Sequence, residues 1–360
     1  MRVMGVDPGT KSFDFCGLDD GELFVDSTIP SEEVMTEPRL VLELLRSAMP
    51  LDLIAGPSGY GLPITHISKI DDKKLFLMVL TKPDDKAREG IIGLRRVVKA
   101  LKEENFNVFF TPGVVHMPTV PTHRKANRID MGTADKLCCA ILGIFDQARH
   151  YKIGYKETSF ILVEMGYGYN AVLGIDGGRI VDGIGGTTGG IGFLSLGGMD
   201  GELAYLLNKF DKSTLRQGGA AYIAGDERIT PEEFAERAHD GRYNLAWKAF
   251  MEGVEKGVAQ MHVSVREPKE ILLSGRLCRV KRIYDELSNR LSDLGEVRKV
   301  EGFAKVAKEA AQGAALLADG LAGGRYKELI DAMNIKEAGG TVLDNIYLKA
   351  IGELRLRYGA

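Results

Sequence analysis

The chain has 360 residues, a formal net charge of -3 and a hydrophobic fraction of 44%. A net charge this close to zero argues against a dedicated binder of nucleic acid or anionic membranes, because such proteins carry clusters of basic residues. No stretch approaches the roughly 18 apolar residues of a membrane span, and the chain starts with an apolar strand rather than a signal peptide. We therefore expect a cytoplasmic protein without membrane or nucleic-acid partners, and the length favours two domains.

Residues 1–30 predict a three-stranded meander. An apolar strand at 2–7 leads into a turn with the sequence DPGTKS, which spans residues 7–12. Alternation of apolar and polar residues then predicts strands at 13–19 and 21–29, joined by a hairpin turn.

The rest of the first half alternates helices with short buried strands. Helical periodicity covers 38–49, 87–105 and 130–151, and apolar runs at 51–57 and 106–113 predict strands. Charge-rich runs at 66–74 and 82–89 are typical of solvated surfaces or turns.

Residues 159–186 repeat the pattern of 1–30: strand, acidic residue, glycine turn, strand, hairpin and strand. The elements predicted after it are helices at 199–209, 231–239, 242–261, 280–291 and 307–324, strands at 269–274 and 296–303, and two helices in 325–357. The repetition predicts an α/β fold of two duplicated lobes with mixed sheets and a central cleft, divided into 1–150 and 151–360.

The first meander turn has the composition of a phosphate-binding loop. Gly9 lets backbone amides point at an anion, and Thr10, Lys11 and Ser12 add side-chain donors. Asp7 would repel a bare phosphate, so we interpret it as a carboxylate in the shell of a Mg²⁺ ion. An ordinary hairpin with a turn-forming Asp and Gly is the alternative for this stretch taken alone.

The second turn lies at the matching place of the second meander. Gly166 and Gly168 again permit a backbone to approach phosphates, and they follow Glu164, a second candidate metal carboxylate. Tyr167, between the glycines, would narrow that approach unless its ring points into the core. Two facing glycine turns would form a clamp for the phosphates of one nucleotide.

Two further segments are candidates for the reacting centre. The proline-containing loop 116–132 is basic, and Arg124 and Arg128 are predicted to stabilise a transferring phosphoryl group. The glycine-rich run 182–192 predicts an anion nest or a substrate flap, with Asp182 as another metal-shell carboxylate. A solvated loop is the alternative for the first segment and a structural loop for the second.

At this point the chain resembles the superfamily of actin, hexokinase, the 70-kDa heat-shock proteins and acetate kinase. The resemblance lies in five motifs in the superfamily's order: VMGVDPGTKS (3–12), GTADKL (132–137), LVEMGYGYNAV (162–172), EILLSGRL (270–277) and VAKEAAQGAALLADGL (306–321). The glycine-rich run 178–207 looks most like acetate and butyrate kinases, and the whole chain resembles archaeal proteins described as predicted butyrate kinases.

The resemblance implies a ribonuclease-H-like, actin-like ATPase fold that binds ATP and Mg²⁺. It implies an adenosine-binding turn at Ser274, Gly275 and Arg276, and a catalytic carboxylate at Asp135 on the first connecting helix. In the hexokinase branch that Asp accepts a hydroxyl proton, whereas a carboxylate acceptor needs no such base. The alternative without a catalytic role is that Asp135 is a carboxylate on the helix surface, paired with Lys136 or another neighbour.

Three functional hypotheses remain open on the sequence. The leading one is a phosphotransferase acting on a small carboxylate such as butyrate. The second keeps the nucleotide but has a hydroxyl acceptor of the sugar type, and the third is a nucleotide-binding switch or scaffold with little chemistry. A homodimer is a further expectation.

Overall fold

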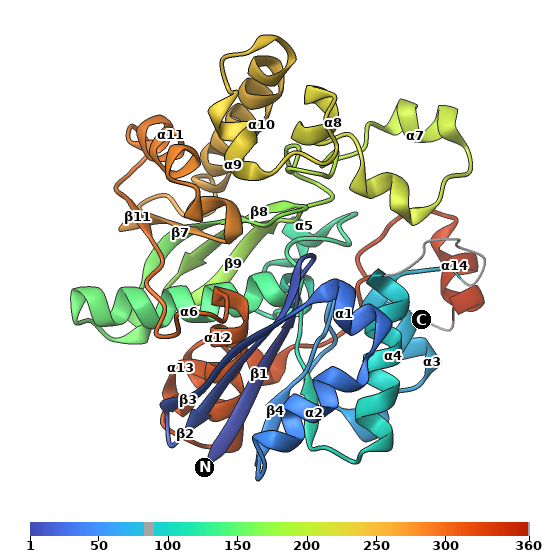
Figure 1. The fold of residues 1–360 in the computed structure, drawn as a ribbon, viewed down its shortest axis with the longest axis vertical. Helices are drawn as coiled ribbons and strands as arrows, with labels where there is room; N and C mark the ends of the chain where they lie inside the picture. The colour runs from blue at the N-terminus through green and yellow to red at the C-terminus, as the bar shows by residue number, and fades with distance from the viewer. Residues whose placement is uncertain (83–89, 359–360) are drawn as a thin grey trace.

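The computed structural model describes residues 1–82 and 90–358. Two mixed β-sheets dominate it (Figure 1), in the orders β3-β2-β1-β4-β6-β5 and β11-β10-β7-β8-β9. Apart from β5, these are the same order: a three-stranded antiparallel meander followed by two strands that run parallel to the first. The duplicated, mixed α/β architecture predicted from the repeated pattern is confirmed.

Each sheet consists of an N-terminal meander and later, shorter strands. The first sheet contains β1 (Arg2–Pro8), β2 (Ser12–Asp19), β3 (Glu22–Pro30), β4 (Leu53–Ala55), β5 (Thr65–His66) and β6 (Val108–Phe110). The second contains β7 (Ser159–Met165), β8 (Asn170–Asp176), β9 (Arg179–Ile184), β10 (Glu270–Ser274) and β11 (Val297–Lys299).

The central strand of the second sheet shows why the sequence forms a sheet buried on both faces. Along β7, Phe160 and Leu162 face one hydrophobic core, and Ile161 and Val163 face another. Successive side chains of a strand point to opposite faces, so a continuous apolar run fills both cores.

Two long helices lie between the sheets and join the lobes. They are α6 (Ala134–Tyr151) and α12 (Glu309–Ala322), which pack on each other; α12 also packs on β1, β2 and β4, and α6 on β7 and β8 (Figure 1). Their crossing is close because Gly313 has no side chain: a Cβ there would lie 1.8 Å from the carbonyl oxygen of Cys138. Helix α12, which ends the second repeat, thus packs against the first sheet.

The remaining helices lie around the two sheets and the two connecting helices (Figure 1). Beside the first sheet lie α1 (Ser31–Thr36), α2 (Arg39–Ser47), α3 (Asp72–Val79) and α4 (Gly90–Glu103), and α5 (Thr122–Lys125) precedes α6. Beyond the second sheet come α7 (Gly201–Leu207), α8 (Ala220–Ala224), α9 (Pro231–Glu236), α10 (Gly241–Met261) and α11 (Lys281–Leu291), and the chain ends with α13 (Lys327–Ala332) and α14 (Ile351–Tyr358).

One predicted surface segment is more ordered than the sequence indicated. Asp71 and its charged neighbours are exposed, as expected, but they begin α3, whose Leu75 and Met78 are buried. The Asp71 carboxylate accepts a hydrogen bond from the backbone N–H of Lys74 and caps this helix. Residues 83–89, which include most of the second charged run and the start of the helix predicted over 87–105, lie outside the described residues.

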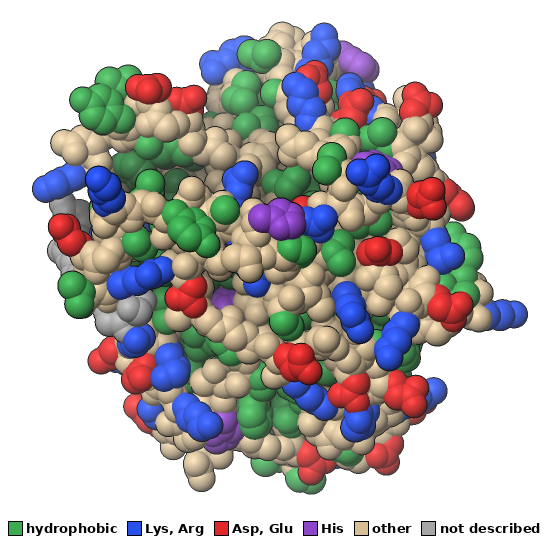
Figure 2. All heavy atoms as spheres, turned by 180° about the vertical axis from the view of Figure 1, so that it is seen from behind, with side chains coloured by type: hydrophobic (Ala, Val, Ile, Leu, Met, Phe, Trp, Pro, Cys, Tyr) green, Lys and Arg blue, Asp and Glu red, His purple; other side chains and the backbone are tan. Residues whose placement is uncertain are grey.

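Acidic and basic side chains are interspersed across the face seen in Figure 2, in agreement with the small net charge. Within 1–82 and 90–358, no helix has the length and apolar character needed to cross a membrane.

Candidate active site

The first glycine turn joins β1 to β2 and faces the second sheet. Gly9 packs so tightly that a Cβ would lie 2.5 Å from Lys308 Nζ and 2.8 Å from the Ser12 carbonyl oxygen. Ser12 itself is buried and does not line the cavity; its hydroxyl donates to Asp14 at 3.0 Å. The turn therefore presents backbone, Thr10 and Lys11, while Ser12 supports it from behind.

The second glycine turn joins β7 to β8 and meets the first. A Cβ on Gly168 would lie 3.7 Å from Thr10 Oγ1, and Lys11 Nζ lies 4.7 Å from the centre of the Tyr167 ring. That ring packs edge-on against Phe193, with centroids 5.4 Å apart. Tyr167 therefore stands beside the space between the turns, with one side of its ring against the core and Lys11 over it.

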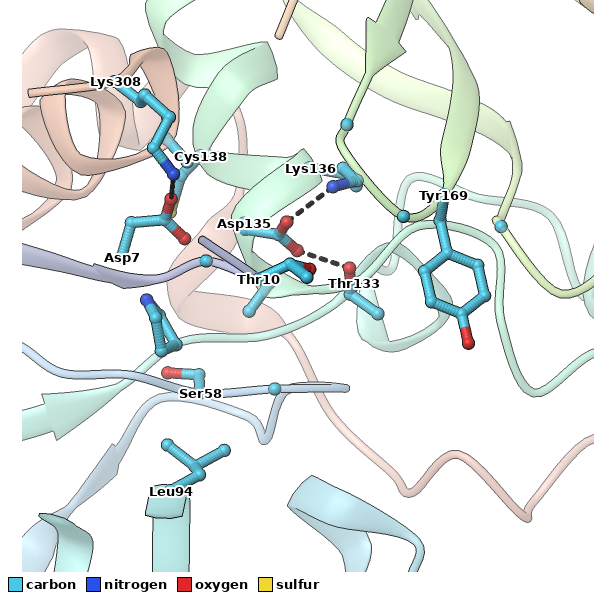
Figure 3. Close-up of a pocket in the computed structure, with 18 of the residues that line it drawn as sticks. Asp7, Thr10, Ser58, Leu94, Thr133, Asp135, Lys136, Cys138, Tyr169 and Lys308 are labelled. Atoms are coloured by element: carbon cyan, nitrogen blue, oxygen red, sulfur yellow. Dashed lines mark hydrogen bonds and ion pairs between the residues drawn. The ribbon is translucent and has the colours of Figure 1, made fainter. Parts of the chain in front are cut away.

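One cavity of about 460 Å³ lies between these turns, a size typical of small-ligand sites (Figure 3). Its lining combines both lobes and both connecting helices. Of the residues predicted from sequence, it includes Asp7, Gly9, Thr10, Lys11, Asp135, Glu164, Gly166, Tyr167, Gly168, Gly275 and Arg276.

Lys136, in the first turn of α6, binds two of these carboxylates. Its ammonium lies 2.6 Å from Asp135 and 2.7 Å from Glu164, and Thr133 donates a hydrogen bond to the other oxygen of Asp135. Burial alone would raise the pKa of Asp135, but the Lys136 charge and these hydrogen bonds lower it below its ordinary value. For Glu164 burial dominates and raises the pKa.

Lys308, at the start of α12, holds the acids of the first turn. Its ammonium lies 2.7 Å from Asp14 and 3.5 Å from Asp7. Figure 3 shows the contact with Asp7. Burial raises the pKa of Asp7 to about 7, although Lys308 opposes that shift. Burial likewise disfavours the charged form of Lys308, but Asp7 and Asp14 outweigh it and raise its pKa.

Sequence reasoning missed both lysines as site residues. Lys136 was considered only as a surface partner of Asp135, and Lys308 stands inside a motif noted for its small residues. The one signal for them in the sequence is that both stand at the start of a predicted connecting helix.

The predicted adenosine turn follows β10 and packs under the second glycine turn. Gly275 has φ +93°, and a Cβ there would lie 2.5 Å from the Met165 carbonyl oxygen. Arg276 crosses to the first lobe and donates to the Ser12 hydroxyl at 3.1 Å. Ser274 is buried away from the cavity lining, and its hydroxyl has no hydrogen-bond partner within the described part of the chain.

Three predicted residues lie elsewhere. Arg124 donates to the Val181 carbonyl oxygen at 2.8 Å and lies 3.8 Å from Asp182, whose other contacts include the Ser264 hydroxyl at 2.5 Å. Arg128 is exposed. None of the three lines the cavity, so their positions add no support to the roles predicted for them.

Part of the glycine-rich run 182–192 borders the cavity, and its role as an anion nest or a substrate flap stays a prediction. Gly186 and Thr187 line the cavity, and Asp130 ties the run down by accepting hydrogen bonds from the Thr187 N–H and hydroxyl at 3.0 and 3.1 Å. Asp130 is itself buried, so this contact fixes the loop after β9 to the segment before α6.

The end of the cavity within the first lobe has an apolar wall. It is formed by Val6, Phe13, Met35, Met78, Val79 and Leu94. The Ser58 and Thr111 hydroxyls beside it are already bonded, to the Gly56 carbonyl oxygen and to each other. From the second lobe, Lys212 of the short 3-10 helix Lys212–Arg216 donates to the carbonyl oxygens of Val79 and Leu80, and Arg216 also lines the cavity.

The donor set suits Mg²⁺ better than a metal held wholly by protein. Within the residues that the structure describes, no group of three or more His, Cys, Asp or Glu side chains could hold an ion. Mg²⁺ typically uses one or two carboxylates together with water and phosphate oxygens. Asp7 and Glu164 end equivalent strands of the two sheets and line the same cavity, so they fit that pattern.

The duplicated sheets, the crossing helices and the cavity between two glycine turns characterise the fold, which is also the fold of an acetate kinase and a propionate kinase of solved structure. The chain belongs to the family described as "Protein of unknown function (DUF1464)", which matches residues 5–348. No curated protein sequence matches it.

Several solved structures with the same fold are named as kinases or putative kinases. An acetate kinase from Entamoeba histolytica has a TM-score of 0.61 at 11% identity, covering 82% of this chain and 87% of its own. A propionate kinase from Francisella tularensis reaches 0.64 at 13% identity, covering 87% and 98%. A Listeria monocytogenes protein described as "a putative N-acetylmannosamine kinase" has a TM-score of 0.50 at 16% identity, covering 92% and 99%. At these identities the likeness establishes the fold.

Proposed function

We propose that the protein is a cytoplasmic phosphotransferase that uses ATP and Mg²⁺ and whose acceptor is a small aliphatic carboxylic acid of about the size of butyrate. The observation that carries the proposal is that one continuous cavity joins both glycine turns to the apolar wall of the first lobe. Nucleotide phosphates would lie between the turns, and the aliphatic chain of the acid against Met35, Met78 and Leu94.

The electrostatics of the cavity suit this reaction. A carboxylate is ionised at neutral pH, so the enzyme must stabilise negative charge rather than remove a proton. Lys11 and Arg216 line the cavity and supply positive charge to the phosphates and the acid. Mg²⁺ held near Asp7 and Glu164 would neutralise charge on the terminal phosphate oxygens.

A hydroxyl kinase is the second candidate, because Asp135 lines the cavity as a base would. Two observations weigh against it. The Lys136 ammonium and the Thr133 hydroxyl engage the two carboxylate oxygens of Asp135, which leaves them less available to a proton of the substrate. The apolar wall also offers few partners for the several hydroxyls of a sugar, since Ser58 and Thr111 are bonded already. A nucleotide-binding switch with little chemistry is the third candidate.

The proposal is tested with purified protein, Mg-ATP and a panel of acids from formate to hexanoate, trapping acyl phosphate with hydroxylamine. We expect hydroxamate and ADP in equal amounts, with the highest kcat/KM for an acid that carries an aliphatic chain. The same panel should include hexoses and N-acetylhexosamines. ADP formation with a sugar and no hydroxamate with any acid would favour the hydroxyl kinase, and Mg-ATP binding without any turnover would favour the switch.

A further inference from the structure

The two connecting helices each deliver a lysine to the strand end of the other repeat. Lys136, on the helix that closes the first repeat, contacts Glu164 at the end of β7 at 2.7 Å. Lys308, at the start of the helix that closes the second, contacts Asp7 at the end of β1 at 3.5 Å. The lysines are thus equivalent in the duplicated fold, but their surroundings differ.

Lys136 is engaged by two carboxylates at short range, 2.6 and 2.7 Å. Lys308 has one short contact, to Asp14 at 2.7 Å, and one long contact, to Asp7. A charge-assisted hydrogen bond between an ammonium and a carboxylate is typically about 2.7–2.9 Å, so the Asp7 contact is a weak one. An ammonium has three donors, and that of Lys308 retains capacity for a stronger acceptor than Asp7.

Lys308 also contacts the first glycine turn. A Cβ on Gly9 would lie only 2.5 Å from Lys308 Nζ. The ammonium therefore lies against the α-carbon of the glycine that opens the first turn, at the edge of the cavity. Lys136 is not among the nearest atoms of either glycine of the second turn.

We propose that Lys308 is a phosphate ligand of the first turn, anchored by Asp14 and able to exchange its weak contact with Asp7 for the terminal phosphates of a bound nucleotide. This inference rests on the proposed function and adds a residue to it. Asp14 is almost completely buried and also accepts from Ser12, so it positions the lysine. A compact ammonium is a suitable phosphate binder, and its departure from Asp7 would leave that carboxylate available to the metal ion.

The simpler alternative is that Lys308 only compensates two buried acids. The two roles differ in how they depend on the number of phosphates. A phosphate ligand contributes to binding of ATP, less to ADP and least to AMP, whereas loss of a structural ion pair weakens all three alike.

The test is calorimetric titration of AMP, ADP and ATP, each with Mg²⁺, into wild type, Lys308→Met and Lys305→Met. Lys305 is exposed on the same segment and does not line the cavity, so it is the matched control. We expect Lys308→Met to weaken ATP binding about tenfold or more and AMP binding less than about twofold, because the hydrogen bond between a charged donor and the terminal phosphates is lost only with ATP. Lys305→Met should match wild type.

A double variant, Asp14→Asn with Lys308→Met, removes the buried acid together with its cation and protects the test against misfolding. It should show the same phosphate-dependent loss. An equal loss for the three nucleotides, or ATP binding restored in the double variant, would overturn the role of Lys308 and leave the proposed function standing. Wild type that binds none of the three nucleotides would overturn both.

Discussion

At the residue scale, the negative charges of the acidic side chains beside the two glycine turns are neutralised by lysines from the connecting helices. Asp7 and Asp14 share Lys308, and Asp135 and Glu164 share Lys136. Buried carboxylates are costly unless they are paired and hydrogen-bonded. The pairing also keeps a cavity with several acids from repelling a polyanionic nucleotide.

Gly9 is a position where a single methyl group should damage binding. We expect Gly9→Ala to weaken Mg-ATP binding by about tenfold or more, because its Cβ would meet Lys308 Nζ and the Ser12 carbonyl oxygen and the turn would have to shift. Calorimetric titration measures the effect. Gly201→Ala is the matched control, since its Cβ meets no atom within 4 Å. Unchanged affinity in Gly9→Ala would show that this turn does not hold the phosphates.

Asp135 separates the two kinase hypotheses. With a carboxylate acceptor, we expect Asp135→Asn to keep kcat within about tenfold of wild type, because no proton is removed, whereas a general base contributes roughly a hundredfold or more. Steady-state assays with the best acceptor decide between them. Asp176→Asn, at an exposed hairpin position, controls for the substitution itself. A loss beyond a hundredfold with nucleotide binding intact would restore Asp135 as a base.

At the element scale, the crossing of α6 and α12 positions the site. Both helices begin at the cavity, where Lys136 and Lys308 lie, and both pack on sheet strands that end at the glycine turns. A stripe of small residues on α12, including Gly313, lets the backbones approach each other. The distance between the helix starts therefore sets the distance between Lys136 and Lys308.

Gly313→Ala should disturb this crossing. The new Cβ would lie 1.8 Å from the Cys138 carbonyl oxygen, a backbone atom that cannot move without shifting α6. We expect the free energy of unfolding to fall by about 1–3 kcal/mol, measured by urea denaturation. Gly352→Ala, in α14 with no atom within 4 Å of its Cβ, should be neutral or slightly stabilising. Equal stability of the two variants would contradict the close crossing.

At the scale of the whole molecule, the two lobes share one hydrophobic core. Apolar residues of both sheets, of α6 and α12, and of the segment 326–343 belong to the same buried cluster. The last part of the chain thus packs with the first lobe although it follows the second in sequence. The division at residue 150 remains a prediction about folding units.

His116 makes the stability of the folded protein depend on pH. It is buried, accepts a hydrogen bond from the Gly113 N–H at 3.1 Å, and its carbonyl oxygen accepts from the Gly339 N–H at 3.0 Å. Burial lowers the pKa of His116 to about 4, against an ordinary value of 6.5. Between these two pH values the imidazole binds a proton in the unfolded chain but not in the folded one. The contribution of His116 to the free energy of unfolding is therefore complete above pH 6.5 and is lost as the pH falls towards 4.

Urea unfolding at about pH 7.5 and at about pH 5 measures this contribution of His116. Wild type should lose about 2 kcal/mol more stability over this range than His116→Asn, whose amide oxygen can still accept from Gly113. His150→Asn, at an exposed position on α6, should behave like wild type. The same loss in wild type and His116→Asn would show that His116 does not bind the proton on unfolding.

Much of the fold could be predicted because it depends on local patterns. Strand alternation in 1–30 and 159–186 is set by period-two burial, and its recurrence revealed the duplication. Helix α3 was missed because its charged start, Asp71 to Lys74, hides a short apolar face. Glycines at 9 and 168 could be recognised as turn residues, since a missing side chain is a local property.

Which residues make up the site depends on contacts between residues that are far apart in the sequence. The sequence by itself determined that two glycine turns and their acids exist in equivalent places, because each is encoded within one meander. Only the tertiary structure decided that Lys136 and Lys308 meet those acids from the opposite repeat, and that Arg124 and Asp182 pair with each other away from the cavity. The physical reason is that local patterns specify each strand and turn, whereas the partner of a buried charge is chosen by how the helices cross.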